Sequence, residues 1–206
     1  MLIEQPPLAY RLLFPEALWR IKHKDHRAVY LTFDDGPVPE VTPWVLDRLD
    51  YHDIKATFFL VGDNVRRSPE LFDQIRARGH SWGNHTMHHL QGMKVTTHRY
   101  LRDLTEADTL IGSSLFRPPH GLLRWSQAAA IKNHYNIVMY DLVTRDYSRR
   151  LTPEQVLENV KRYTRNGSII VFHDSLKARA NMTAVLDDAI IWLKNQRYEF
   201  RVLPME

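Results

Sequence analysis

The chain has 206 residues, 11 histidines and no cysteine, and its 28 Lys and Arg residues exceed its 24 Asp and Glu residues. The absence of cysteine excludes disulfide-stapled scaffolds, iron–sulfur and zinc-ribbon sites and thiol catalysis, so any metal must be held by imidazole or carboxylate groups. A hydrophobic fraction of 44% and a charged fraction of 25% are ordinary for a globular protein, and the length suits one domain.

Residues 1–27 mix apolar and basic side chains without the basic start and uninterrupted apolar stretch of a secretory signal. We expect them to form an N-terminal extension that packs on one end of the following domain or, alternatively, lies on a membrane surface. No apolar run approaches the roughly 18 residues of a membrane span, so no transmembrane segment is expected. These features favour a cytoplasmic or membrane-peripheral location.

From residue 28 the chain alternates short apolar runs with segments of helical period. The runs are partly continuous in apolar character, as expected of strands buried on both faces of a parallel sheet. A full eight-stranded barrel usually takes about 250 residues, so six or seven strands suit this chain better. The predicted strands are Ala28–Phe33, Ala56–Val61, Leu115–Phe116, Asn136–Tyr140, Ser168–Phe172 and Phe200–Leu203.

Helix ends are marked between these runs. Ser68 before Pro69 predicts an N-cap, and Gly79 predicts the end of that helix. A capping box at Thr152-Pro153-Glu154-Gln155 starts another helix, and Asn166-Gly167 follows it. Two apolar stripes predict further helices, Leu101, Leu104, Leu110 and Ile111 before Gly112, and Leu186, Ala189, Ile190 and Leu193. Repeated strand–helix units predict an α/β barrel or an open doubly wound sheet.

Polar clusters follow the apolar runs, and the carboxyl ends of parallel strands share the face that hosts the active site. We therefore expect five clusters to converge on one pocket. They are Asp34-Asp35, His85 to His89, Arg117 to Gly121, Asp141 to Tyr147, and His173-Asp174. The scattered Lys and Arg residues, in contrast, favour a solvated surface and give no reason to expect a nucleic-acid partner.

Each cluster alone has an ordinary structural explanation. Asp34-Asp35 before Gly-Pro is also a common turn sequence, but two adjacent carboxylates at a buried strand end favour a shared cation or proton. His85 and His89 are spaced i, i+4, which would place two imidazoles on one helical face, as zinc sites use, although surface histidines reach this spacing by chance. Arg117 could be a surface charge and His173 a buried core histidine. Because an ordinary explanation would have to hold for all five clusters at once, we interpret them together as a functional site.

Five motifs follow one another along the chain: Thr32-Phe33-Asp34-Asp35-Gly36, His85-x-x-x-His89, Arg117-Pro-Pro-x-Gly121, Asp146-Tyr147 and Val171-Phe172-His173. In this order they resemble the motifs of the NodB-homology polysaccharide deacetylases, carbohydrate esterase family 4. The resemblance implies a distorted (β/α)7 barrel over residues 28–206, with its active site at the C-terminal ends of the strands. It also implies metal-dependent hydrolysis of N-acetyl groups on amino sugars.

The resemblance also implies roles. Asp35, His85 and His89 match the metal ligands, for one divalent ion, with Zn²⁺ first and Co²⁺ or Ni²⁺ as alternatives. Asp34 matches the general base and His173 the general acid, with Arg117 orienting Asp34 and Asp146 orienting His173. The backbone N–H at His120 matches an oxyanion donor, and Tyr147 and Val171 match the pocket wall around the acetyl methyl. His88 is interpreted as a bystander.

Two departures concern the substrate more than the reaction. The family usually has Tyr where this chain has His120, and Trp where it has Tyr147. The expected partner is an acetylated amino-sugar unit of a polysaccharide, peptidoglycan or oligosaccharide. Two alternatives stay open: a hydrolase of another acetamide or an O-acetyl ester built on the same fold, and an inactive carbohydrate-binding homologue.

Overall fold

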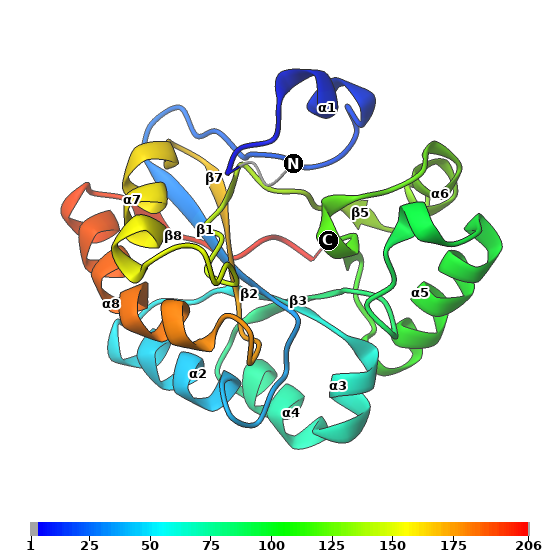
Figure 1. The fold of residues 1–206 in the computed structure, drawn as a ribbon, viewed down its shortest axis with the longest axis horizontal. Coiled ribbons are helices and arrows are strands. Elements are labelled where there is room, and N and C mark those ends of the chain that lie inside the picture. Colours follow the sequence, from blue (N-terminus) through cyan, green and yellow to red (C-terminus); the bar gives the residue numbers. More distant parts are fainter. Residues whose placement is uncertain (1–3, 206) are drawn as a thin grey trace.

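A computed structural model describes residues 4–205, so the outermost residues of the predicted segments 1–27 and 28–206 lie outside the described part of the chain. Helices surround a central parallel sheet (Figure 1). The strands are β1 (Ala28–Asp34), β2 (Thr57–Leu60), β3 (Ser81–Asn84), β4 (Leu115–Phe116), β5 (Asn136–Ile137), β6 (Leu142–Val143), β7 (Ser168–His173) and β8 (Glu199–Phe200). Seven of them follow the order β5-β4-β3-β2-β1-β7-β6, and β8 pairs with β1.

The ends of this order meet, which makes the sheet a distorted barrel. Strands β5 and β6 lie at opposite ends of the order but are almost consecutive in the chain. Between them, the Val138 N–H donates to the Phe116 carbonyl of β4 (2.8 Å), and the Asp141 N–H donates to the Ile169 carbonyl of β7 (3.0 Å). This segment therefore bonds first to one edge and then to the other, and the predicted α/β barrel is confirmed.

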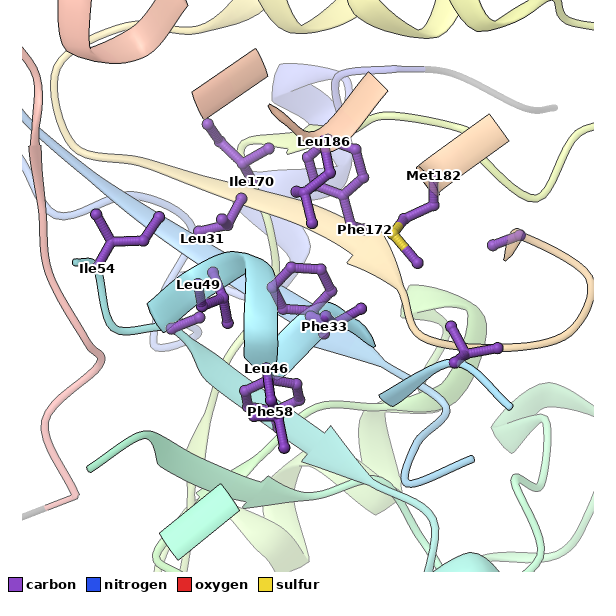
Figure 2. Close-up of a cluster of buried hydrophobic side chains, with 14 of the residues drawn as sticks. Leu31, Phe33, Leu46, Leu49, Ile54, Phe58, Ile170, Phe172, Met182 and Leu186 are labelled. Carbon is purple, nitrogen blue, oxygen red and sulfur yellow. The ribbon is translucent and has the colours of Figure 1, made fainter. Parts of the chain in front are cut away.

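The inward and outward positions of β1 alternate, as the pleat requires. Val29, Leu31 and Phe33 pack against the surrounding helices, whereas Tyr30 faces the barrel interior. Figure 2 shows the outer cluster, in which Phe33, Phe58 and Phe172 of three neighbouring strands meet Leu46 and Leu186 of two helices. The same alternation places Asp34 on the interior side at the carboxyl end of β1, where the site is built.

Two strands were not predicted, and three predicted strands are shorter, among them Ala56–Val61, which is reduced to Thr57–Leu60. Strand β3 has the sequence Ser-Trp-Gly-Asn, which carries neither alternation nor a β-branched run. Gly83 is required there because a Cβ atom would lie 2.5 Å from the Phe59 ring. The predicted strand Asn136–Tyr140 ends at Ile137 because the chain then changes edges. Of the predicted strand Phe200–Leu203, only Phe200 lies in a strand, as the last residue of β8. Strand β6 was missed because only two residues pair.

The helices mostly begin and end where the sequence indicates. They are α1 (Leu8–Leu13), α2 (Thr42–Tyr51), α3 (Gly62–Arg67), α4 (Pro69–Ala77), α5 (Thr97–Ile111), α6 (Trp125–Ile131), α7 (Pro153–Tyr163) and α8 (Arg179–Asn195), with 3-10 turns η1 (Gly92–Lys94) and η2 (Pro119–Gly121). The capping box at Thr152 is present, but Ser68 makes no side-chain cap bond. Leu110, predicted on the buried stripe of α5, is 38% exposed. No helix of residues 4–205 combines the length and apolar character that crossing a membrane requires.

The N-terminal segment, residues 4–27, lies against the barrel. Phe14 and Trp19 are buried in a cluster with Phe116 of β4. Leu18 forms a parallel bridge with Val138, at the point where the chain changes edges. The N-terminal segment thereby covers the part of the barrel where the two ends of the strand order meet. The domain boundary at residue 28 stays a prediction.

Candidate active site

The adjacent carboxylates at the end of β1 point to different partners. Asp34 is buried and its Oδ1 accepts a 2.6 Å hydrogen bond from Arg117 Nη1. Asp35 has a φ of 83°, which turns its side chain away from that of Asp34 toward two imidazoles. The left-handed backbone at Asp35 thus separates the two carboxylates, because Asp34 faces the Arg117 guanidinium and Asp35 faces the imidazoles of His85 and His89.

Arg117 is one of the largest fully buried side chains of the protein. Its Nη1 also donates to Thr32 Oγ1 (2.8 Å), and its Nη2 donates to the Met139 carbonyl (3.1 Å). The guanidinium lies over the Phe59 ring, with Cζ 4.0 Å from the ring centroid. These contacts fix the plane of the guanidinium and therefore the position of the Asp34 carboxylate.

His85 and His89 come together on a loop, and the helical face expected from their spacing is wrong. The loop follows β3 directly, with positive φ angles at Thr86 (65°) and His89 (53°). Asp103 holds this loop from α5, because its Oδ2 accepts from the backbone N–H of Met87 (2.9 Å). The i, i+4 spacing therefore reflects a tight turn, which periodicity alone does not distinguish from a helix.

One ligand atom each from Asp35, His85 and His89 lies within 4.8 Å of the others, in a group able to hold a metal ion. His85 Nδ1 donates to the Arg117 carbonyl (2.7 Å), which leaves Nε2 unprotonated and 3.8 Å from Asp35 Oδ1. His89 Nε2 lies 3.2 Å from the same oxygen. A backbone carbonyl that fixes the tautomer of a ligand histidine is typical of metal sites.

The electrostatics of this group favour a cation. Burial lowers the pKa of His85 to about 4, against the opposing effect of Asp34, so its ring is neutral at pH 7. Burial would raise the pKa of Asp35, but the hydrogen bond from His89 and the nearby His173 and His85 rings hold that pKa well below its usual range. An ionised carboxylate between two imidazoles matches the donor set that Zn²⁺ accepts.

His88 lies apart from this group. Its Nδ1 is hydrogen-bonded to Asp103 Oδ1, and its Nε2 is 3.7 Å from Asp63 Oδ2. The hydrogen bond to Asp103, ahead of the opposing effect of burial, raises the His88 pKa. Adjacent histidines on one loop therefore have different partners.

At the end of β7, His173 forms a second imidazole–carboxylate unit. Its Nδ1 donates to Asp146 Oδ1 and its backbone N–H donates to Asp146 Oδ2, and both hydrogen bonds are 2.7 Å long. Although burial lowers the His173 pKa, the Asp146 charge and hydrogen bond, with Asp35 and Asp34 behind them, raise it to about 9. Asn181 Nδ2 holds the Asp146 carbonyl from α8 (3.1 Å).

The three residues predicted to contact substrate lie around these groups. His120 is exposed on η2 with a φ of 62°, and its ring centroid is 4.7 Å from that of His89. The Tyr147 ring meets His173 edge-on, with centroids 4.9 Å apart. Val171 is buried on β7, two residues before His173 and therefore on the same face.

Two residues that hold the site loops were assigned no role from the sequence. Asp174 is buried and accepts from the Gly36 N–H (3.0 Å) and from Thr42 Oγ1 (2.6 Å), and burial raises its pKa to about 7. Tyr10 of α1 donates from its hydroxyl to the Gly121 carbonyl beside His120 (2.5 Å). Asp174 belongs to a predicted cluster, but Tyr10 gave no signal because its partner lies 111 residues further along the chain.

A groove of about 650 Å³ opens beside the metal-binding group. Its lining includes Asp35 and His89, together with residues of the loop after β1, of α3 and of the loop between β7 and α8. Arg67 and Lys177 lie on its walls.

Comparisons with known proteins find deacetylases that are similar to this chain. The family model for polysaccharide deacetylase matches residues 21–139. A peptidoglycan-N-acetylglucosamine deacetylase of Bacillus cereus is 31% identical, with 88% of each chain covered. A chitooligosaccharide deacetylase of Bradyrhizobium sp. (strain ANU 289) is 35% identical, with 72% of this chain and 71% of that protein covered.

A solved structure gives the same result. The crystal structure of a peptidoglycan N-acetylglucosamine deacetylase, in complex with 4-naphthalen-1-yl-N-oxidanyl-benzamide, superposes with a TM-score of 0.86 at 30% identity. The match covers 95% of this chain and 94% of that one. The likeness therefore extends over the whole barrel and into the N-terminal segment.

Proposed function

Because this chain belongs to the polysaccharide deacetylase family, we propose that it is a metal-dependent hydrolase that removes N-acetyl groups from amino-sugar units of a glycan. One observation carries the proposal. The group Asp35, His85 and His89 lies at the same end of the barrel as Asp34 and His173, each of which has its own buried, oppositely charged partner. Water activation and nitrogen protonation need this combination of groups.

Asp35, His85 and His89 would hold one divalent ion, for which Zn²⁺ suits two imidazoles and a carboxylate, with Co²⁺ and Ni²⁺ as alternatives. When bound, the ion would acidify water and polarise the acetyl carbonyl. Three protein ligands leave positions open for water and substrate.

Asp34 is the proposed general base. Asp34 Oδ1 accepts a 2.6 Å hydrogen bond from the buried Arg117, which orients the Asp34 carboxylate. The other carboxylate oxygen of Asp34 is free to accept the proton of the attacking water. Proton transfer by a positioned side chain contributes about 10²–10⁴-fold to the rate. The geometry accounts for two carboxylates with two roles, since Asp35 faces the imidazoles and Asp34 faces the guanidinium.

His173 is the proposed general acid. Asp146 accepts from Nδ1, so the proton at Nε2 is the one available to the departing nitrogen. With a pKa raised to about 9, the ring is protonated at neutral pH and delivers that proton as the C–N bond breaks. The products are acetate and a free amino sugar.

The backbone N–H of His120 would support the oxyanion, a contribution worth about 3 kcal/mol of barrier for one donor. Tyr147 and Val171 would enclose the acetyl methyl. Tyr147 already contacts His173, so it orders the acid as well as the pocket wall.

Acetate release is the direct test. Wild-type protein loaded with Zn²⁺ should release acetate from N-acetylated chito-oligosaccharides or peptidoglycan fragments, and Asp34→Asn should lower that rate by about 10²–10⁴-fold while metal content is kept. Wild-type turnover in Asp34→Asn would contradict the assigned base.

The same assay separates the alternatives. Faster turnover of simple O-acetyl esters or unrelated acetamides than of amino sugars would indicate another substrate for the same groups. Sugar binding without any acetate release by metal-loaded protein would indicate an inactive carbohydrate-binding homologue.

A further inference from the structure

The outward face of α1, a helix at the periphery of the barrel (Figure 1), is apolar. Leu8 and Leu12 are spaced i, i+4 and therefore share one face of the helix, where they are 71% and 68% exposed. The one charged residue of α1, Arg11, is turned inward, with Nη1 2.9 Å from Oδ1 of the buried Asp141. A surface helix usually has the opposite arrangement, with its polar residues outside. The outer face of α1 is therefore suited to contact with an apolar partner.

Hydrogen bonds join this face to two neighbouring segments. The Leu13 carbonyl at the end of α1 accepts from Trp125 Nε1 at the start of α6 (3.1 Å), yet the Trp125 side chain is 71% exposed. Arg124 Nη2 in turn donates to the carbonyl of Met93 on η1 (2.8 Å), and the Met93 side chain is exposed as well. A contiguous exposed apolar surface marks a site of interaction, whereas single exposed apolar residues are ordinary. We call this surface the apolar patch; it consists of Leu8, Leu12, Leu13, Met93 and Trp125.

The chain around the apolar patch has no free carboxylate. Three stretches contain the patch, and none of them includes Asp or Glu: residues 5–15, 90–102 and 109–140. The two acidic residues that flank the first stretch are each paired with a cation. Glu4 lies 2.6 Å from Arg145 Nη1, and Glu16 lies 3.0 Å from Lys132 Nζ.

Two cations, in contrast, lie at the edge of the apolar patch without an acidic partner. Lys94 directly follows Met93, and Arg124 directly precedes Trp125, and both are exposed. The acceptor of Arg124 is a backbone carbonyl, which leaves the guanidinium charge uncompensated. No ion pair of residues 4–205 includes Lys94 or Arg124. The edge of the apolar patch is therefore positively charged.

We propose that the apolar patch, with Lys94 and Arg124 at its edge, docks on a lipid surface that carries anionic headgroups. Leucine side chains on the outer face of a helix enter the boundary between headgroups and acyl chains. Tryptophan is enriched at this depth, and Lys and Arg are attracted to anionic headgroups. The patch combines these three features. This inference concerns binding and does not depend on the proposed hydrolysis.

A second copy of the chain is the other partner that an apolar patch could bind. In a twofold dimer formed through this surface, the same patch of each copy would face that of the other. Lys94 and Arg124 would then lie against cations, with no free carboxylate in the surrounding stretches to offset them. The charge therefore favours an anionic lipid surface over a dimer.

The apolar patch lies beside the candidate active site. Tyr10, between Leu8 and Leu12 in sequence, donates from its hydroxyl to the Gly121 carbonyl, next to His120 (2.5 Å). Docking through the patch would therefore bring the loop of His120 close to the lipid surface.

Co-sedimentation of the full chain with vesicles tests the inference. Vesicles of phosphatidylcholine alone are compared with vesicles in which about a third of the lipid is anionic phosphatidylglycerol. We expect wild-type partitioning to be roughly twentyfold stronger on the anionic vesicles, because each cation near such a surface contributes about fivefold. This preference should fall as the salt concentration is raised.

Variants separate the apolar contribution from the charge. The double variant Leu8→Gln with Leu12→Gln should weaken partitioning to both kinds of vesicle by about a hundredfold, since burial of each leucine contributes about tenfold. Arg124→Gln should reduce only the preference for anionic vesicles, by about fivefold. Ile191→Gln is the matched control, because Ile191 is an exposed apolar residue of α8 outside the patch. Thermal unfolding checks that each variant is folded, and Arg124→Gln tests the surface without a change in α1.

Absence of vesicle binding by the wild type would overturn the inference, as would equal binding to the two kinds of vesicle. A loss in Ile191→Gln as large as that in the double variant would overturn the assignment to α1. A wild-type dimer that the double variant dissociates, without vesicle binding, would assign the patch to a second copy instead. None of these outcomes depends on acetate release, so they differ from failure of the proposed function.

Discussion

Two imidazole–aspartate groups lie at the same end of the barrel and differ in charge. In the group of Asp35 and His85, burial keeps the imidazole neutral, with a pKa of about 4. In the pair of Asp146 and His173, a 2.7 Å hydrogen bond and the aspartate charge raise the imidazole pKa to about 9. The same two residue types therefore give a group suited to holding a metal ion in one place and a group suited to the proposed proton donation in the other.

The partner of Nδ1 decides the difference. His85 Nδ1 bonds to the carbonyl of Arg117, a neutral acceptor that fixes the tautomer. His173 Nδ1 bonds to a buried carboxylate, which stabilises the imidazolium. Residue type alone does not assign the role of a histidine, because the role follows from the acceptor that the fold supplies. The following predictions test this contrast, beginning with the largest effect.

Removal of metal from the group of Asp35, His85 and His89 should abolish acetate release. Treatment with a chelator followed by dialysis should reduce acetate release to background, since Asp35, His85 and His89 supply no nucleophile themselves. Addition of one equivalent of Zn²⁺ should restore it, measured by acetate release. Full activity of metal-free protein would contradict the proposed role of Asp35, His85 and His89.

Arg117→Met should destabilise the fold, because the buried Asp34 loses its 2.6 Å partner. Breaking a buried ion pair by removing one member costs about 3–5 kcal/mol. Denaturant unfolding measures this change. The double variant Arg117→Met with Asp34→Asn should recover much of the loss, and an equally unstable double variant would show that packing over Phe59 causes the effect.

Asp146→Asn should lower the pKa of His173, so that this imidazole resembles that of His85. In the wild type, the His173 pKa of about 9 lies above the unfolded value of about 6.5. Its protonated form therefore stabilises the fold fully below pH 6.5, and this contribution is lost as pH rises through 9. The alkaline limb of kcat should fall in the same range.

Without the Asp146 charge, burial lowers the His173 pKa. The alkaline limb of the pH–rate profile should then shift to lower pH, and the rate at pH 8 should fall by about 10–100-fold. The pH profile of acetate release measures both changes. An unchanged alkaline limb would assign it to a group other than His173.

Tyr10→Phe should have the smallest effect. It removes the 2.5 Å hydrogen bond to the Gly121 carbonyl, beside the backbone donor at His120, and leaves the ring packing of α1 in place. Loss of one such bond costs about 0.5–1.5 kcal/mol. We expect a fewfold decrease in kcat at unchanged metal content. A loss of metal instead would show that the N-terminal segment supports the ligand group.

The barrel class, and the residues that lie together at the end of its strands, were predicted better from the sequence than the local structure that joins them. Strand β1 was evident because its buried apolar run is long, whereas β3 was missed because Ser-Trp-Gly-Asn carries no strand pattern. His85 and His89 lie four residues apart, as they would on one face of a helix, so periodicity could not distinguish the turn between them from a helix.

Other features depend on contacts between distant parts of the chain. The closure of the barrel after Ile137 depends on two separate edges, and no local pattern encodes that change. Asn181 and Asp103 hold the site loops from helices, where their sequence neighbours resemble those of any exposed polar residue. Side chains that act through a hydrogen bond to a distant backbone atom leave no motif.

Metal content of two matched variants tests the central claim most directly. His85→Ala and His88→Ala alter histidines of the same loop, but His85 faces Asp35 and His88 faces Asp103. The account predicts about one Zn²⁺ per chain in the wild type and in His88→Ala, and almost none in His85→Ala. One Zn²⁺ retained in His85→Ala, or lost in His88→Ala, would contradict it.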